Sequence, residues 1–272
     1  MSWRFLRTPK WIVRHVLVVA LVAAMIGAMF WQLRRHDQKQ DHNALVEQRE
    51  LAEPVDVREL LDPGAGTRED AVDQVLYRQV TARGTYLDDD TVVVENRTYN
   101  STSGGWVLTP LDLGDGTAVV VNRGFIGFDR AGQIVAPPAP TGTVTVAGLV
   151  FPSQHRGSFG ATDPDEGKLD RLARVDLDRY DQQVDEDLLP AYVQLDRSDP
   201  PEPEAAPGAP QLVTLGPPDL DDGPHVSYAV QWAIFSTIAA GGYLLLLRRV
   251  AKDQAREEAL DAPAGDGPTG EG

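Results

Sequence analysis

Two uncharged apolar runs, one near each end of the chain, constrain its fold more than any other feature. The first covers residues 16–33 and the second covers residues 228–247. As helices with a rise of about 1.5 Å per residue, each would extend roughly 27–30 Å, which matches the hydrocarbon core of a bilayer. A helix buried in a soluble core would show a polar stripe. We therefore expect transmembrane helices at residues 15–34 and 225–247.

Basic residues predict the orientation of these helices, because Lys and Arg gather at the cytoplasmic ends of membrane spans. Four precede the first run and four follow the second: Arg4, Arg7, Lys10, Arg14, Arg248, Arg249, Lys252 and Arg256. The end of the first run is ambiguous, since Arg34 and Arg35 follow it, whereas acidic residues precede the second. We expect a multi-pass protein of the cell membrane with a cytoplasmic N-terminus (1–14), a disordered cytoplasmic tail (248–272) and an extracytoplasmic middle.

A cleaved signal peptide is the competing interpretation of the first run. The apolar stretch is longer than the core of a usual signal peptide. It ends in Phe30, Trp31 and Gln32 rather than in the small residues of a cleavage site. Trp31 also suits the aromatic belt at a membrane interface. We therefore expect a retained anchor.

The segment between the runs is strongly acidic. Residues 40–224 hold 14 Lys and Arg residues against 34 Asp and Glu residues, a formal charge of −20. A nucleic-acid binder needs the opposite sign to displace counterions from phosphates, so we expect no nucleic-acid partner. The chain has no cysteine, which excludes disulfides, thiolate nucleophiles and haem attachment through cysteine.

Short β-rich segments with few helix signals between them predict the fold of the middle. The candidate strands are residues 75–86, 91–98, 106–109, 117–121, 144–151 and 192–195. Gly114-Asp115-Gly116 is typical of a tight hairpin turn, and residues 168–189 suggest one or two short helices. We expect an α+β domain over residues 35–197, built on an antiparallel sheet or small barrel. Residues 198–224, rich in proline and acid, predict a solvated linker or a long loop.

Familiar catalytic motifs do not occur in this sequence. It contains neither a Gly-x-Ser-x-Gly elbow nor a glycine-rich phosphate loop. None of the five histidines pairs with another at a helical metal-ligand spacing. We expect no catalytic residues and no enzyme activity.

Two residues remain as candidates for ligand binding, each with an alternative. His225 lies where the second run begins, and a lone imidazole beside an apolar wall can ligate a porphyrin iron or bind lipid headgroups. Arg123 follows the apolar run 117–121. Its guanidinium can bind a carboxylate such as a haem propionate, or form an internal ion pair with one of the many acids. Composition alone does not decide either case.

Several blocks occur in an order that is typical of one family. They are GAMFWQLRRHDQK at 27–39, VTARGTY at 80–86, GWVLTPL at 105–111, VVVNRGFIG at 119–127, AGL at 147–149 and HVSYAVQW at 225–232. Together they resemble the surfeit locus protein 1 family, the assembly factors of haem-copper cytochrome c oxidase. Phe125 replaces a frequent Trp, and Pro224 replaces the family's Asn before the histidine. Residues 198–224 resemble an insertion of actinobacterial members.

The resemblance implies a non-enzymatic role in oxidase biogenesis. It implies help in delivering haem a to subunit I or inserting it there, close to the haem a synthase, with haem a as a transient cofactor. Subunit I, the synthase and the lipid bilayer would be the partners. His225 would be the axial iron ligand, supported by Arg123 and Tyr228. The alternative is a two-span adaptor or sensor whose outer domain binds a protein or small ligand without haem.

Overall fold

The computed structural model describes residues 4–62, 72–157 and 160–260 of the chain. The chain divides into two compact units. The helical unit combines residues 1–43 with residues 220–272, and the barrel unit comprises the residues between them. We describe each unit separately.

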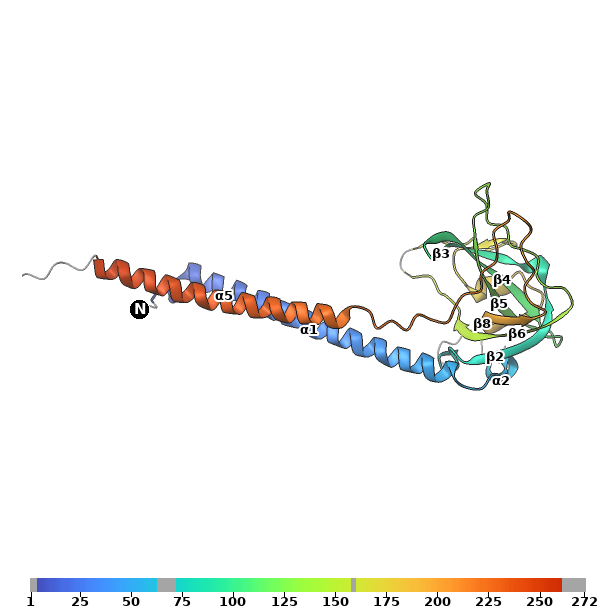
Figure 1. The fold of residues 1–272 in the computed structure, drawn as a ribbon, viewed down its shortest axis with the longest axis horizontal. Coiled ribbons are helices and arrows are strands. Elements are labelled where there is room, and N and C mark those ends of the chain that lie inside the picture. Colours follow the sequence, from blue (N-terminus) through green and yellow to red (C-terminus); the bar gives the residue numbers. More distant parts are fainter. Residues whose placement is uncertain (1–3, 63–71, 158–159, 261–272) are drawn as a thin grey trace, which may run out of the picture. The chain divides into compact units, whose positions relative to one another are not determined.

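Two long helices form the helical unit. They are α1 (Pro9–Glu50), which follows a short 3-10 turn at Arg4–Arg7, and α5 (His225–Leu260). Figure 1 shows them side by side, and they run antiparallel because contacts join His15 to Tyr243 and Gln32 to His225. Their most apolar windows are 0% and 6% buried. They are therefore not core helices of a soluble fold, and both are long and apolar enough to cross a membrane.

Both helices extend beyond the apolar runs. Helix α1 continues to Glu50, as the polar residues after the first run suggested, and ends before Pro54. Helix α5 continues to Leu260, so a disordered tail beginning at residue 248 is not what the structure shows. Residues 248–260 contain neither glycine nor proline and are rich in good helix formers, which explains the extension. The remainder of the expected tail lies outside the described residues.

The barrel unit is built on an eight-stranded sheet with the order β1-β2-β6-β8-β5-β4-β3-β7. The strands are β1 (Val55–Asp56), β2 (Gln79–Tyr86), β3 (Val92–Tyr99), β4 (Thr102–Asp112), β5 (Thr117–Gly127), β6 (Thr143–Pro152), β7 (Arg171–Leu172) and β8 (Asp187–Asp199). Strand β2 also pairs with β4, which closes β2, β6, β8, β5 and β4 into a ring. Within this ring only β5 and β8 run parallel. The result is a small Greek-key barrel of the OB type.

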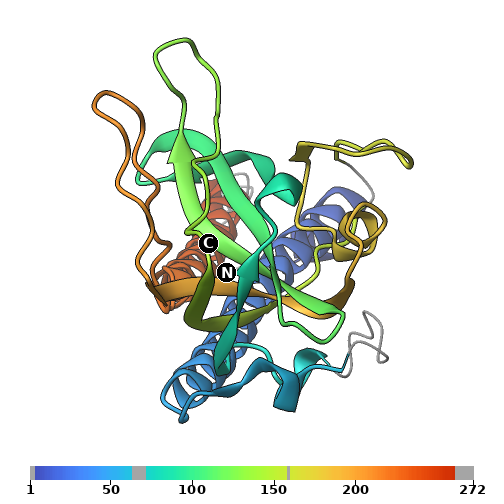
Figure 2. The ribbon, with the colours of Figure 1, turned by 90° about the vertical axis from the view of Figure 1, so that its right-hand side faces the viewer.

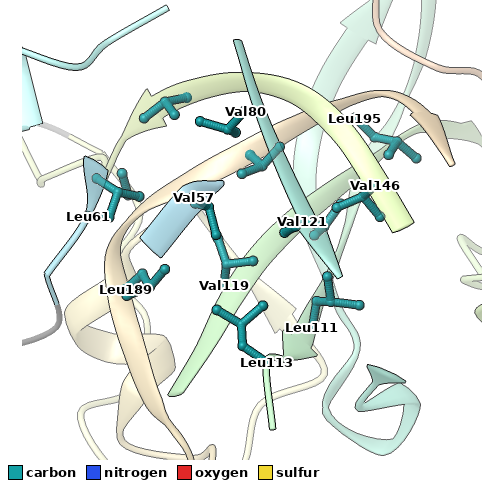
Figure 3. Close-up of a cluster of buried hydrophobic side chains, with 14 of the residues drawn as sticks. Val57, Leu61, Val80, Leu111, Leu113, Val119, Val121, Val146, Leu189 and Leu195 are labelled. Atoms are coloured by element: carbon teal, nitrogen blue, oxygen red, sulfur yellow. The ribbon is translucent and has the colours of Figure 1, made fainter. Parts of the chain in front are cut away.

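Side chains at every second position of the ring strands fill the interior of the barrel. This period of two is the repeat of a strand with one face buried. Figure 3 shows these side chains converging from several strands. The main contributors are Val80, Ala82, Val119, Val121, Val144, Val146, Val150, Leu189, Ala191, Val193 and Leu195.

A second apolar cluster covers the outer face of β3, β4, β5 and β8. Its cover is the chain around β7 and the short helix α4 (Leu177–Asp181), from which the Tyr180 hydroxyl donates to the carbonyl oxygen of Asp90. The expectation of helices over residues 168–189 is thus correct for α4 alone. Leu172 belongs to β7, and Leu188 and Leu189 belong to β8, because their side chains complete the two apolar clusters.

The polar residues 100–105 predict a turn, but the turn between β3 and β4 is shorter than this. It is limited to Asn100 and Ser101, which have φ values of 46° and 63°. Gly104 and Gly105, expected in the turn, belong to β4. A Cβ atom at Gly104 would lie 2.1 Å from the Ile126 carbonyl oxygen, so glycine at this position allows β5 to approach closely.

Substitution of Gly84 tests the closure of the barrel. A Cβ atom at this position in β2 would lie 2.0 Å from the carbonyl oxygen of Asp112 in β4. We expect Gly84→Ala to lower the free energy of unfolding by about 1–3 kcal/mol, because the two strands must separate to relieve the overlap. Thermal unfolding of the detergent-solubilised full chain measures the effect. The matched control is Gly127→Ala, whose Cβ would meet nothing closer than 3.7 Å. Equal melting temperatures for the two variants would contradict the β2–β4 contact.

Candidate functional site

The three expected site residues are divided between the two units. His225 and Tyr228 lie on α5 in the helical unit, and Arg123 lies on β5 in the barrel unit. Within the described ranges, no group of three or more His, Asp or Glu side chains is arranged to hold a metal ion. We therefore consider each residue by its own contacts.

His225 is the first residue of α5 and is partly buried. Its Nδ1 atom lies 2.9 Å from the Oε1 atom of Gln32 on α1. An amide oxygen only accepts, so Nδ1 carries the proton and donates. In a neutral imidazole, Nε2 then holds the lone pair, and Nε2 makes no hydrogen bond within the described part of the chain. These features fit an axial ligand for a porphyrin iron.

Tyr228 lies one helical turn after His225. Its backbone amide donates to the carbonyl oxygen of Pro224 at 3.1 Å, which forms part of the first turn of α5. The side chain is 48% exposed. Since residues three apart on a helix share a face, Tyr228 presents an open aromatic surface next to His225.

Polar side chains along α1 hold the chain segment that leads into α5. Gln32, Gln40 and Asn43 share one face of α1, since their spacing follows the helical repeat. The Asn43 amide donates to the Leu220 carbonyl oxygen at 2.7 Å and to Asp222 at 3.0 Å, and Gln40 donates to Asp222 at 3.4 Å. The segment directly before His225 is thus held against α1.

A second histidine contact joins the opposite ends of the two helices. The Nδ1 atom of His15 on α1 shares a hydrogen bond with the hydroxyl of Tyr243 on α5, and the two rings meet edge to face with centroids 5.8 Å apart. The sequence predicts no more for His15 than an ordinary surface or interface residue. Nothing in the sequence pairs it with Tyr243, because the two residues are 228 positions apart.

Arg123 is fully buried at one end of the barrel interior. It continues the inward-facing series of Val119 and Val121 on β5. Its Nη2 atom lies 2.6 Å from Glu202, and its Nε atom lies 3.1 Å from the same carboxylate. The guanidinium also donates to the carbonyl oxygens of Pro137 and Pro138 at 3.0 Å each. This is the internal ion pair that the sequence left open as the alternative to a propionate site.

The surroundings of Arg123 explain why it needs a carboxylate partner. The ring of Tyr86 packs near the guanidinium, whose Cζ atom is 5.6 Å from the ring centroid. Burial, and secondarily the charge of Glu202, raises the pKa of the Tyr86 hydroxyl above its ordinary value, so this hydroxyl remains neutral. Glu202 is therefore the group that balances the charge of Arg123. Sequence reasoning missed Glu202 because it is one of many acids in a proline-rich stretch.

The residues after Arg123 attach the same proline-rich stretch to the barrel. Phe125 and Val213 exchange two backbone hydrogen bonds of 2.8 Å. Gly124 has a φ of 142°, and a Cβ atom there would lie 2.4 Å from the Val213 carbonyl oxygen. Residues 200–219 are thus a long loop that belongs to the barrel unit, rather than a free linker, and β8 continues to Asp199 before it.

Two loops of the barrel unit enclose an apolar groove of about 740 Å³. One loop follows β5 and the other is the proline-rich stretch, and Figure 2 shows them projecting side by side. The walls are mainly prolines and small apolar residues, among them Val135, Pro137, Pro203 and Pro207. Arg130 also lines this groove. The groove has the composition of a site for an apolar ligand or peptide.

Comparisons with known proteins agree with the resemblance in the sequence blocks. The sequence profile of the SURF1 family matches residues 19–237. Uncharacterized SURF1-like proteins of Mycobacterium tuberculosis and Mycobacterium bovis are each 28% identical over 262 residues, which cover 95% of this chain and 91% of the relative. A SURF1-like protein of Dictyostelium discoideum is 27% identical over 100 residues, 36% of this chain and 37% of that protein. The mycobacterial matches agree with the likeness to actinobacterial members.

Neutralising Glu202 tests the role of the buried ion pair. We expect Glu202→Gln to lower the free energy of unfolding by roughly 3–5 kcal/mol, because Arg123 would keep an uncompensated charge inside the barrel. The matched control is Glu204→Gln, two residues along the same loop and exposed. Chemical denaturation of the full chain in detergent measures both, and the double variant Arg123→Met/Glu202→Gln should recover most of the loss. Equal stability of the two single variants would show that Glu202 does not balance Arg123.

Proposed function

Because the chain belongs to the SURF1 family, known as cytochrome oxidase assembly factors, we propose that it is a membrane-anchored assembly factor without enzymatic turnover. In this proposal it assists the delivery or insertion of haem a into subunit I of cytochrome c oxidase, next to the haem a synthase. The observation that carries the proposal is the profile match over residues 19–237, which includes most of the first apolar run, half of the second and the whole barrel unit.

The contacts within the helical unit support a pair of membrane spans. The His15–Tyr243 and Gln32–His225 contacts are 17 residues apart along α1, a rise of about 26 Å. This length is close to the thickness of the hydrocarbon core, which supports a position for one polar contact near each boundary. Both contacts use residues of the expected first span, 15–34, which favours a retained anchor over a cleaved signal peptide. The basic residues at the outer ends of both runs support cytoplasmic termini and a barrel unit on the outside.

The residues around His225 support the haem part of the proposal. Haem supplies an iron that accepts an imidazole nitrogen as an axial ligand. His225 offers Nε2 for this bond, and Tyr228 offers an exposed ring beside it. A single imidazole suits a carrier that must release its haem. Arg123 is occupied by Glu202, so it would reach a propionate only after that carboxylate had left.

The groove in the barrel unit favours the second candidate function. Its proline-rich walls and volume of about 740 Å³ suit an adaptor or sensor that binds a peptide or small ligand without haem. The absorbance spectrum of the purified protein separates the two functions. A Soret band supports the assembly factor, and a colourless protein that binds a ligand through the groove supports the adaptor.

Reporter fusions test the membrane topology. We expect a fluorescent protein fused behind Gly272 to be fluorescent and a phosphatase at the same place to be inactive, because the C-terminus is cytoplasmic. A phosphatase fused behind Asp219, before α5, should be active because this position is outside. The reverse pattern, or release of the intact chain from membranes by carbonate, would contradict the two-span topology.

Substitution of His225 tests the haem role. We expect His225→Ala to lower both the haem that co-purifies with the full chain and the amount of assembled oxidase, because the iron loses its imidazole. His155→Ala, an exposed histidine of the barrel unit, is the control and should change neither quantity. Pyridine haemochrome spectra and oxidase activity in membranes provide the measurements. Unchanged haem content in His225→Ala would remove the ligand role.

A further inference from the structure

Gln32 holds the imidazole of His225 in one orientation. The Oε1–Nδ1 distance of 2.9 Å joins residues that are 193 positions apart, on two different helices. Gln32 shares a face of α1 with Gln40 and Asn43. The side chains of those two residues bond to the segment before α5. The segment that leads into His225 is therefore held on α1 by contacts other than the one with Gln32.

The open side of the imidazole is the Nε2 edge. On that side the chain has Gly223, with a φ of 70°, and a Cβ atom there would lie 3.5 Å from both Nε2 and Cδ2. A side chain at this position would contact this edge, and glycine has none. In the described part of the chain Nε2 has no hydrogen-bond partner. The ring is thus anchored through Nδ1, and Nε2 keeps its lone pair.

We propose that Gln32 is the positioning residue for His225: it fixes the tautomer with the proton on Nδ1 and directs the Nε2 lone pair toward a haem iron. This inference rests on the proposed function, since it assigns a role within the same site. Metal-bound imidazoles commonly donate their second N–H to a fixed acceptor, which sets the ring orientation and raises the basicity of the ligand. Gln32 supplies such an acceptor from α1, whereas the ligand itself belongs to α5.

A merely structural role for Gln32, as a contact between the helices, predicts different behaviour. A structural contact would affect how the helices pair but would leave the electronic properties of a bound iron unchanged. A positioning role changes the affinity and the reduction potential of the bound haem, because the acceptor on Nδ1 controls how strongly Nε2 donates. These quantities distinguish the two roles.

The experiment titrates the detergent-solubilised full chain with haemin, a ferric haem used as the probe. We expect Gln32→Leu to weaken haemin binding about tenfold or more. Gln32→Glu should retain binding and lower the midpoint potential of the bound haem, because a carboxylate acceptor makes the imidazole more basic. The matched control is Gln38→Leu, the same substitution at an exposed position of α1, which should leave affinity, Soret position and potential unchanged.

The outcomes separate this inference from the proposed function. If His225→Ala loses haemin while both Gln32 variants bind it with the affinity and potential of the natural chain, the positioning role is wrong and the ligand role stands. If the natural chain does not bind haemin, or if His225→Ala binds it as tightly as the natural chain, the proposed haem function itself is wrong. If Gln32→Leu does not fold, as circular dichroism would show, the potential of Gln32→Glu decides the matter.

Discussion

A guanidinium inside an apolar barrel is the constraint on which the arrangement of the barrel unit depends. Arg123 is fully buried, and a buried charge is stable only when it is paired and hydrogen-bonded. Its partners come from two separate loops: the carbonyl oxygens of Pro137 and Pro138, and the carboxylate of Glu202. The ion pair therefore closes one end of the barrel and holds both loops there. The apolar groove lies between these same loops, so its existence follows from the same charge.

In the helical unit, a few polar contacts determine how two apolar helices pair. Two apolar helices have no hydrophobic reason to associate within lipid, where specific packing and hydrogen bonds decide the pairing. Here each end of the pair has one contact that involves histidine, His15 with Tyr243 and His225 with Gln32. Between them, Ser236 and Thr237 bond to carbonyl oxygens of their own helix. The register of the helices is thus set at the two ends, and the second contact also orients the candidate haem ligand.

Sequence reasoning was most accurate where a pattern is local. The apolar runs lie in α1 and α5, Gly114-Asp115-Gly116 forms the turn between β4 and β5, and the apolar run 117–121 is part of a buried strand. It was wrong where a partner distant in sequence determines the local structure. Leu188 and Leu189 look helical by composition, yet β8 pairs them with other strands. For the proline-rich stretch the sequence left a linker and a long loop open, and the contacts of Glu202 and Val213 show the loop.

The sequence alone determined that two helices long enough to span a membrane precede and follow an acidic β-rich domain along the chain. Length, hydropathy and alternation are properties of neighbouring residues. It also indicated His225 and Arg123 as candidates for ligand binding. Only the tertiary structure decided that Arg123 is paired with Glu202 and that Nδ1 of His225 is held by Gln32. Such pairings depend on which distant segments meet when the sheet closes and the helices align. A linear pattern does not record them, since any of many acids or amides could have been the partner.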